Sequence, residues 1–283
     1  MKELKRRIQR SERIDADLAK WKAELADLTK RYDDAIEVED FDLVDELQGA
    51  IEGVQDRLKP GFFLTPEGVK GCEHFFDMRG KGGNVKDQCS GLMAKLKGGA
   101  RRTEEGVVLD GKKGSFWKKG SYVKLDPWPI GGPTSIEVYV RYANFDTNYA
   151  RVFWFGQNNG HDTVSVYNDD NDWKKRIRWW VDQGSKSRYL YGESTCFNRR
   201  AWVHTVVTAC GSTLCIYKNG ELALTATDGW EPNTLTRDLH CIGSYKGKYQ
   251  FLNGTVAFLR SWGVALKADE VQKLYASRNI RYY

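Results

Sequence analysis

The residues best suited to binding chemistry lie together between positions 168 and 181. Asn168–Asp172 places oxygen-bearing side chains at consecutive positions. Oxygen-rich loops of this kind suit Ca²⁺, which takes about six to eight oxygen ligands. The stretch lacks the glycine and the terminal Glu of an EF-hand loop, so an Asx-rich turn is the simpler interpretation. Two hypotheses remain: a Ca²⁺ site at Asp169, Asp170 and Asp172, or a turn and no cofactor.

The residues that follow, Trp173–Val181, mix aromatic and basic side chains. On a β-strand, alternate side chains point to opposite faces. One face would carry core residues, which are Ile177, Trp179 and Val181. The other would carry a candidate surface for a ligand or partner, formed by Arg176, Arg178 and Trp180. An aromatic ring among cations suits stacking on a sugar or a protein contact, although a neighbouring loop or the helical part of the chain could instead cover Trp180.

Sequence patterns for His-based or phosphate chemistry are missing. His74, His161, His204 and His240 are scattered, and none belongs to an HExxH motif. His204 falls inside a predicted strand, where a packed or hydrogen-bonded structural role is expected. The glycine-rich run Gly80–Gly83 follows no convincing strand, and its lysine is misplaced for a phosphate loop.

Composition divides the chain near position 60. Gly is absent from the first 48 residues, and nine of the ten Trp follow Pro60. Residues 1–59 hold 12 Lys and Arg against 16 Asp and Glu, a net charge of −4, which leaves 32 against 22, a net of +10, for residues 60–283. We expect a helical part at 1–59, a linker at 60–71 and a turn-rich part at 72–283. The basic part favours anionic partners such as acidic glycans, or is a solvated surface.

Signals for membrane insertion or export are missing as well. No stretch approaches the ~20 apolar residues of a membrane helix, and Met1–Arg13 is too charged for a secretory leader. We therefore expect no membrane span and an intracellular location, cytoplasmic or organellar, where the six cysteines stay reduced.

The first 59 residues show two apolar stripes at helical spacing. One repeats by threes and fours from Leu4 to Ala35, and the second runs from Phe41 to Leu58. Asp40 can cap the second helix. We expect an antiparallel helical hairpin of coiled-coil type, which buries too little surface to stand alone. It must therefore pack on the sandwich, on another copy of the chain or on a partner. We expect it to dock through its second stripe, which includes Phe41, Val44, Leu47 and Ile51.

Residues 28–58 resemble the UVR motif, a short helical hairpin that makes protein–protein contacts in its family. The matching positions are Ala35, Asp40-Phe41, Asp45, Leu47 and Ile51, and Val44 stands where the motif usually has Ala. A plain coiled-coil hairpin explains the pattern equally well. Both interpretations predict docking.

From about Gly106 the chain alternates short apolar runs with turn-forming residues. Ile136–Tyr142, Val164–Tyr167 and Val203–Thr208 have strand character, and Asn219-Gly220 is a hairpin-turn signal. Many short strands at this spacing predict a mainly β fold, a two-sheet antiparallel sandwich.

Four stretches of this part resemble the laminin-G-like family of concanavalin A-like jelly rolls, over about residues 72–278. They fall within Val107–Leu125, Thr134–Arg141, Trp202–Gly243 and Phe251–Tyr275. The resemblance implies two curved antiparallel sheets and a short C-terminal helix near Lys267–Ser277. Members of this family bind glycans, proteins, steroids or lipids, and related jelly rolls hydrolyse glycans, so the fold alone does not decide the function.

The hydrolytic relatives carry three carboxylates on one strand, as Glu-x-Asp-x-x-Glu, which sets the carboxyl spacing that glycoside hydrolysis needs. No predicted strand holds this array, and the nearest acidic string, Glu37–Asp40, belongs to the hairpin turn. We therefore predict that the protein is not an enzyme.

Three functions remain in order of preference. The first is a non-catalytic binding or scaffold protein, an adaptor or accessory subunit of a larger intracellular assembly that docks through the hairpin and the sandwich surface. The second is a carbohydrate-binding lectin, calcium-dependent if the Asp site is real, and the third is a glycan hydrolase. The expected partners are proteins of the assembly or an acidic glycan. Nucleic acid is not expected, because the basic stretch Lys2–Arg13 is more simply a solvated helix start.

Overall fold

The computed structural model describes residues 2–37, 40–58, 64–111, 120–168, 176–191 and 197–279. The chain forms two compact units, of which the first ends at Cys72 and the second spans Glu73–Asn279. Within the described residues, no helix offers a stretch that is both long and apolar enough to span a membrane.

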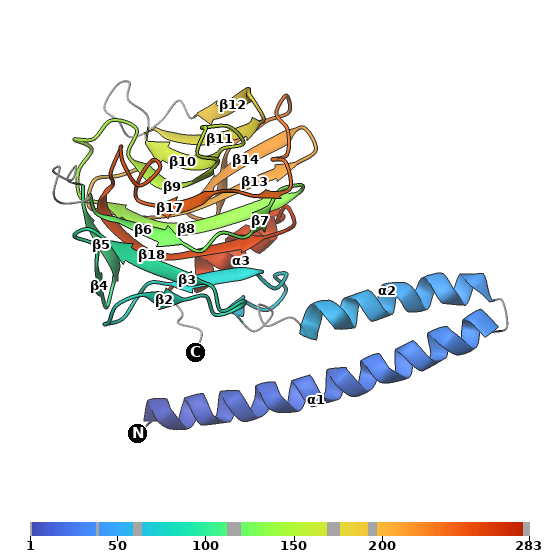
Figure 1. Ribbon diagram of the computed structural model, residues 1–283. Coiled ribbons are helices and arrows are strands. Elements are labelled where there is room, and N and C mark those ends of the chain that lie inside the picture. Colours follow the sequence, from blue (N-terminus) through green and yellow to red (C-terminus); the bar gives the residue numbers. More distant parts are fainter. Residues whose placement is uncertain are drawn as a thin grey trace. The chain divides into compact units, whose positions relative to one another are not determined.

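The first unit contains two antiparallel helices, and α1 (Lys2–Glu37) is twice as long as α2 (Phe41–Leu58) (Figure 1). The backbone amide of Leu43 donates to Asp40 Oδ1 over 3.1 Å, so Asp40 caps α2 as predicted. Asp42 in the first turn of α2 also complements the helix dipole. The predicted antiparallel helix pair is confirmed.

The contact between the helices uses the predicted stripes. Ala35 of α1 and Val54 of α2 are buried, as expected for side chains on facing stripes. Arg57 near the end of α2 forms a 2.8 Å ion pair with Glu24 in the middle of α1, and its guanidinium lies 5.6 Å from the Trp21 ring centroid. These contacts place the end of α2 beside the middle of α1, so the first turns of α1 extend past α2.

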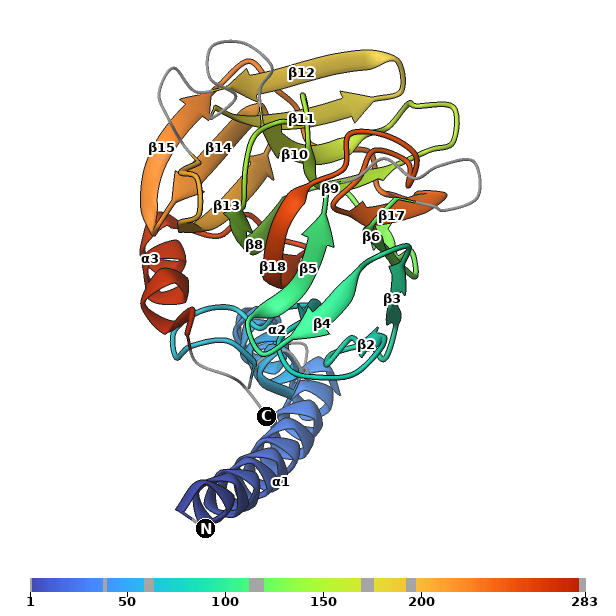
Figure 2. The same cartoon turned by 90° about the vertical axis from the view of Figure 1, so that its left-hand side faces the viewer.

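The second unit is a sandwich of two antiparallel sheets. Figure 2 shows the main path of sheet A, which contains, in spatial order, β15 (Glu221–Ala226), β14 (Thr213–Lys218), β13 (Trp202–Cys210), β8 (Thr134–Tyr142), β18 (Asn253–Trp262), β5 (Gly106–Asp110) and β4 (Arg101–Thr103). Strand β1 (His74–Asp77) also pairs with β18. Sheet B contains β12 (Lys186–Tyr191), β11 (Ile177–Gln183), β10 (Val164–Asn168), β9 (Arg151–Gly156), β17 (Leu239–Ile242), β6 (Tyr122–Leu125), β3 (Met93–Lys97) and β2 (Val85–Lys86). A two-stranded ribbon joins β7 (Pro129–Ile130) to β16 (Leu235–Thr236). The predicted mainly β sandwich is confirmed.

The core lies between the two sheets, because every second side chain of each central strand points inward. Val138 and Val140 of β8 meet Phe153 and Phe155 of β9 in one cluster, together with Trp179 of β11. All five side chains have no exposed surface. Burial of one such side chain contributes roughly 1.5–3 kcal/mol, so this cluster fixes which face of each strand is outward.

The outward face of sheet A carries a buried ionic cluster near helix α3 (Ala268–Ser277). Glu137 Oε1 lies 2.7 Å from His204 Nε2, and Glu137 Oε2 lies 3.2 Å from Arg260 Nε. The ring of Tyr275 on α3 lies 5.6 Å from the His204 ring. Burial alone would raise the pKa of Glu137, but the Arg260 charge and the His204 contact outweigh it and hold that pKa below its usual value. His204 therefore has the hydrogen-bonded structural place that its strand position indicated.

Replacement of Glu137 by Ala should lower the free energy of unfolding by about 3–5 kcal/mol, because it removes the buried carboxylate that pairs with the Arg260 guanidinium. Chemical denaturation followed by tryptophan fluorescence measures this. The control is Glu221→Ala at an exposed position of β15, which should change stability by less than about 0.5 kcal/mol. A Glu137→Ala loss as small as that of the control would mean that the cluster does not stabilise the sandwich.

Candidate functional site

Strand β11 splits its side chains between the core and the outward face of sheet B. The core receives Ile177, Trp179 and Val181. Arg178 and Trp180 lie on the outward face and are half-buried. Arg176, the third member of the predicted set, precedes β11 and is also half-buried. The structure thus brings Arg178 and Trp180 to one surface, and their role in binding stays a prediction.

The pairing of four strands aligns Arg and Tyr side chains in one row across this outward face. Arg151 of β9 pairs with Tyr167 of β10, Tyr167 with Arg178 of β11, and Arg178 with Tyr191 of β12. The neighbouring row consists of Trp154, Ser165, Trp180 and Tyr189. We call these two rows the β9–β12 face.

Cations stack on aromatic rings throughout the β9–β12 face. The Arg151 guanidinium lies 3.7 Å from the Tyr167 ring centroid and 5.2 Å from that of Trp180. The Arg178 guanidinium lies 5.1 Å from the Tyr191 centroid, and the rings of Trp180 and Tyr189 are 5.4 Å apart. Contacts of this kind contribute about 0.5–2 kcal/mol each, and they fix the ring orientations before any ligand binds.

Exposure increases along the face toward the edge of the sheet. Arg151 and Tyr167 are only 5% and 3% exposed, whereas Tyr191 on the edge strand β12 is 52% exposed. The accessible part of the face therefore lies on β11 and β12 and consists of Arg178, Trp180, Tyr189 and Tyr191.

The loop between β17 and β18 covers the buried end of the row. Arg151 Nε donates to Gln250 Oε1 over 3.1 Å, and the Tyr245 ring centroid lies 5.2 Å from the guanidinium. Burial lowers the pKa of Arg151, and Tyr167 and Tyr245 oppose this effect, so the group stays cationic. None of the described atoms accepts a hydrogen bond from Arg151 Nη1.

A single carboxylate, that of Asp182, belongs to the strands of this face, because β9, β10 and β12 contain no Asp or Glu. Asp182 is 2% exposed and accepts a hydrogen bond from Trp180 Nε1. Burial raises the pKa of Asp182 despite the hydrogen bonds that it accepts. Its visible role is to hold the Trp180 ring in place.

The predicted calcium ligands Asp169, Asp170 and Asp172 lie outside the described residues. Among the residues that are described, no group of three His, Cys, Asp or Glu side chains could hold a metal ion. The Ca²⁺ site stays a prediction.

The predicted docking stripe of the hairpin differs in exposure along its length. Phe41 is 71% exposed, Val44 and Ile51 are half-buried, and Leu47 is 2% exposed. Ile36 of α1, which the stripe did not include, is 49% exposed near the same turn. Leu47 therefore belongs to the hairpin interior, and the accessible apolar surface is at Phe41 and Ile36.

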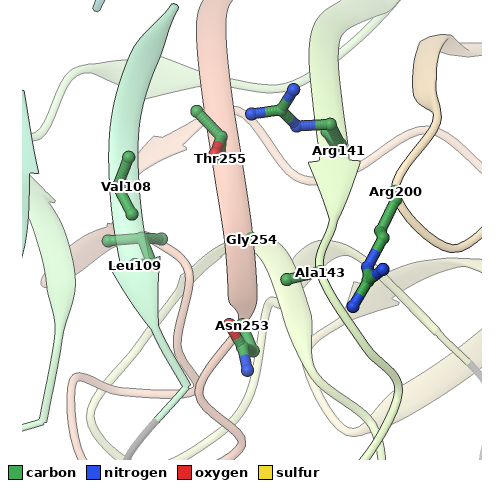
Figure 3. A pocket seen from close by; sticks show the side chains of 8 residues that line it. All are labelled: Val108, Leu109, Arg141, Ala143, Arg200, Asn253, Gly254 and Thr255. Atoms are coloured by element: carbon green, nitrogen blue, oxygen red, sulfur yellow. The ribbon is translucent and has the colours of Figure 1, made fainter. Parts of the chain in front are cut away.

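A second surface lies on the outward face of sheet A, over β5, β18 and β8 (Figure 3). A cavity of about 300 Å³ is lined by Val108, Leu109, Arg141, Ala143, Arg200, Asn253, Gly254 and Thr255. An adjoining cavity of about 610 Å³ shares Val108, Arg141 and Thr255 with it and adds residues 81 and 101–105. We call the two together the sheet A groove.

Ser90, His74 and Asp87 contact one another, but not as a catalytic triad. His74 Nδ1 lies 2.6 Å from Asp87 Oδ2, to which Ser90 Oγ also donates. Ser90 Oγ lies 3.3 Å from the same His74 Nδ1. In a triad the serine and the aspartate contact opposite ring nitrogens. Because both use Nδ1 here, this arrangement does not activate Ser90.

Known proteins place the chain in a family. The model described as the concanavalin A-like lectin/glucanases superfamily (Laminin_G_3) matches residues 118–272. The match covers more than half of the chain, and the chain belongs to this superfamily. The resemblance of the sandwich is thereby confirmed, while the UVR resemblance stays a prediction. No curated protein matches the chain.

Solved structures with a similar fold include a Trypanosoma rangeli sialidase in complex with sialic acid, with 16% identity, a TM-score of 0.56, and coverage of 84% of this chain and 40% of that chain. The botulinum neurotoxin serotype G binding domain is similar with 17% identity, a TM-score of 0.55, and coverage of 73% of this chain and 51% of that chain. The chain spans about half or less of these proteins, and at such identities they show the fold alone.

Of the residues in the two rows of the β9–β12 face, only Arg178 and Trp180 were predicted from the sequence as binding residues. Tyr189 and Tyr191 alternate with the buried Leu190 after a turn at Gly184, and this short alternation could have indicated strand β12. Arg151 and Tyr167 had no local signal, because their partnership depends on which strands pair.

Replacement of His240 by Phe should reduce the loss of unfolding free energy that occurs as the pH falls below about 6.5. His240 is fully buried and packs 4.4 Å from both Trp128 and Phe155. Burial, with the charges of Arg237 and His74, holds the pKa of His240 well below 6.5. As the pH falls through about 6.5, His240 takes up a proton in the unfolded chain but not in the folded chain. Protonation therefore favours the unfolded state, and the free energy of unfolding decreases as the pH falls below that value.

Urea unfolding at pH 5 and pH 8 measures the effect (~1.4 kcal/mol per pH unit at most for one group). His240→Phe should lose less stability than the wild type on acidification. His161→Phe, at an exposed position, is the control and should follow the wild type. Equal acid losses in wild type and His240→Phe would contradict the assignment.

Proposed function

We propose that this protein is a non-catalytic carbohydrate-binding protein whose ligand lies on the accessible part of the β9–β12 face. The observation that supports this most is the pairing of partly exposed rings with an arginine. Trp180, Tyr189 and Tyr191 offer apolar plates to the C–H face of a sugar ring. Arg178 beside them offers hydrogen-bond donors to hydroxyl or carboxylate oxygens.

Membership in a superfamily whose description includes lectins supports the same proposal. The net charge of +10 on residues 60–283 and the position of Arg178 favour an acidic sugar over a neutral one. Among the described strands of the β9–β12 face, Asp182 supplies a single, buried carboxylate. Most glycoside hydrolases use two carboxyl groups on either side of the scissile bond, so this supports a binding role over hydrolysis of that kind.

Removal of the Tyr191 ring should weaken glycan binding. We expect the wild-type chain to bind acidic oligosaccharides on a glycan array. Tyr191→Ala should reduce the affinity for the best of them about tenfold, as for a central aromatic contact, and Arg178→Gln should reduce binding of acidic sugars more than of neutral ones. Isothermal titration of the selected oligosaccharide measures both.

The control for these variants is Leu222→Ala, which removes an equally exposed apolar side chain from strand β15 of sheet A. It should leave the affinity unchanged. If the wild-type chain bound no glycan on the array, or if Tyr191→Ala bound the selected oligosaccharide with wild-type affinity, this site would be refuted.

A second function, docking on a protein partner of a larger assembly, is supported by the exposed side chains of Phe41 and Ile36. Large apolar side chains exposed together near one turn form a small contact surface. This function is compatible with glycan binding, because the hairpin and the sandwich are separate compact units.

Substitution of Phe41 by Ser should abolish capture of that partner in quantitative affinity purification from the native source. Thermal stability should stay within about 1 °C of the wild type, because an exposed side chain contributes little to folding. Leu222→Ser is the matched control, since Leu222 is also exposed but belongs to the sandwich. An identical set of captured proteins for all three chains would exclude docking through Phe41.

A further inference from the structure

The sheet A groove is separate from the β9–β12 face, because the two lie on the outward faces of different sheets. Its lining combines an apolar floor with walls in which basic side chains outnumber the two acidic ones, Glu104 and Glu105. Val108 is half-buried and Ala143 exposed on the floor, with Gly254 between them in Figure 3. A Cβ atom on Gly254 would lie 2.4 Å from the Arg141 carbonyl oxygen, so the close approach of β18 to β8 requires glycine at this position.

Two arginines of the groove are held in place by the fold. Arg141 forms a two-point ion pair with Glu105, at 3.2 and 2.7 Å, and its guanidinium lies 4.8 Å from the Trp202 ring centroid. Arg102 donates to the carbonyl oxygens of residues 77, 78 and 79 over 2.7–3.1 Å. These contacts fix the walls in advance of binding.

Three further cations are exposed: Lys81, Arg101 and Arg200. Among the described residues, none of the three forms an ion pair. They come from separate parts of the chain, since Arg101 lies on β4 and Arg200 in the turn before β13. The groove therefore presents positive charge from both sides, and Figure 3 shows Arg141 and Arg200 together on the side opposite Val108.

The backbone of the floor takes no part in recognition. Strand β18 pairs with β5 on one side and β8 on the other, and β5 also pairs with β4. A peptide therefore cannot pair as an extra strand with β18 or β5, which form the floor. Recognition must rest on side chains, which here are guanidinium groups above aliphatic surface. Guanidinium groups bind carboxylates with two parallel hydrogen bonds.

We propose that the sheet A groove binds an extended peptide of a protein partner in which acidic residues alternate with small aliphatic ones. Carboxylates of the peptide pair with Arg101 and Arg200, and its aliphatic side chains contact Val108 and Ala143. Nucleic acid fits less well, because the described residues that line the groove include no aromatic side chain on which bases could stack. A sulfated glycan would use the cations but not the apolar floor.

Fluorescence anisotropy with the full chain tests this, with a labelled peptide of alternating Glu and Val as the probe. We expect saturable binding that weakens as salt rises from about 50 to 200 mM. Arg200→Glu and Arg101→Glu should each weaken binding about tenfold, as for loss of a charge-assisted hydrogen bond. Lys186→Glu, at an exposed position of β12, should bind as the wild type does, and a Glu–Gly peptide should bind more weakly than the Glu–Val peptide.

Absence of binding, or unchanged binding by Arg200→Glu and Arg101→Glu, overturns the proposal. A sulfated oligosaccharide or a single-stranded oligonucleotide that binds more tightly than the peptide, and loses binding in the same variants, assigns the groove to that polyanion instead. Equal binding of the Glu–Gly and Glu–Val peptides would remove the apolar floor from the site. These measurements concern residues of sheet A alone, so a negative result for the groove would not contradict glycan binding on the β9–β12 face of sheet B.

Discussion

The sandwich depends on the antiparallel pairing of strand β18 with three other strands. Its first half pairs with β5, its second half with β1, and its other side with β8. Its inward side chains Val256 and Leu259 belong to the core, and its outward Arg260 belongs to the buried ionic cluster. The start of the strand, at Gly254, is the floor of the sheet A groove. A shift of one residue in this pairing would move all of these side chains to the opposite face.

Arg260 on sheet A and Arg151 on sheet B are both buried, but their charges are stabilised in different ways. Arg260 has a carboxylate partner in Glu137, and the guanidinium also lies 4.6 Å from the Phe75 ring centroid. Arg151 is instead surrounded by the rings of Tyr167, Trp180 and Tyr245, with Gln250 as its hydrogen-bond acceptor. None of the described carboxylates forms an ion pair with Arg151. A buried cation is costly, and cation–π attraction from the surrounding rings offsets part of that cost. An anion bound at the open end of the same row would lower that cost further, because the positive potential of Arg151 adds to that of Arg178.

The parts of the structure that could be predicted from the sequence are those set by local periodicity. The capping role of Asp40 and the inward position of Trp179 follow from neighbours a few residues away. The Arg151–Tyr191 row does not, because it joins side chains 40 positions apart through the pairing of four strands. The sheet A groove was missed for the same reason, since Arg101, Arg141 and Gly254 meet only once β4, β8 and β18 are in register. For Phe41 and Leu47, one apolar stripe predicted a shared role, but only the packing of α1 on α2 decides which of the two remains exposed.

The separation of the two surfaces has a consequence for binding. Two packed sheets stand about 10 Å apart, so ligands on their outward faces do not collide and one does not displace the other. A glycan held on sheet B would keep the sheet A groove near any protein that carries both the glycan and an acidic segment. The second contact would then form at the high effective concentration of an intramolecular event, and weak individual contacts would combine into a strong one. Exposed, preoriented side chains on both outward faces are suited to two-point recognition of this kind.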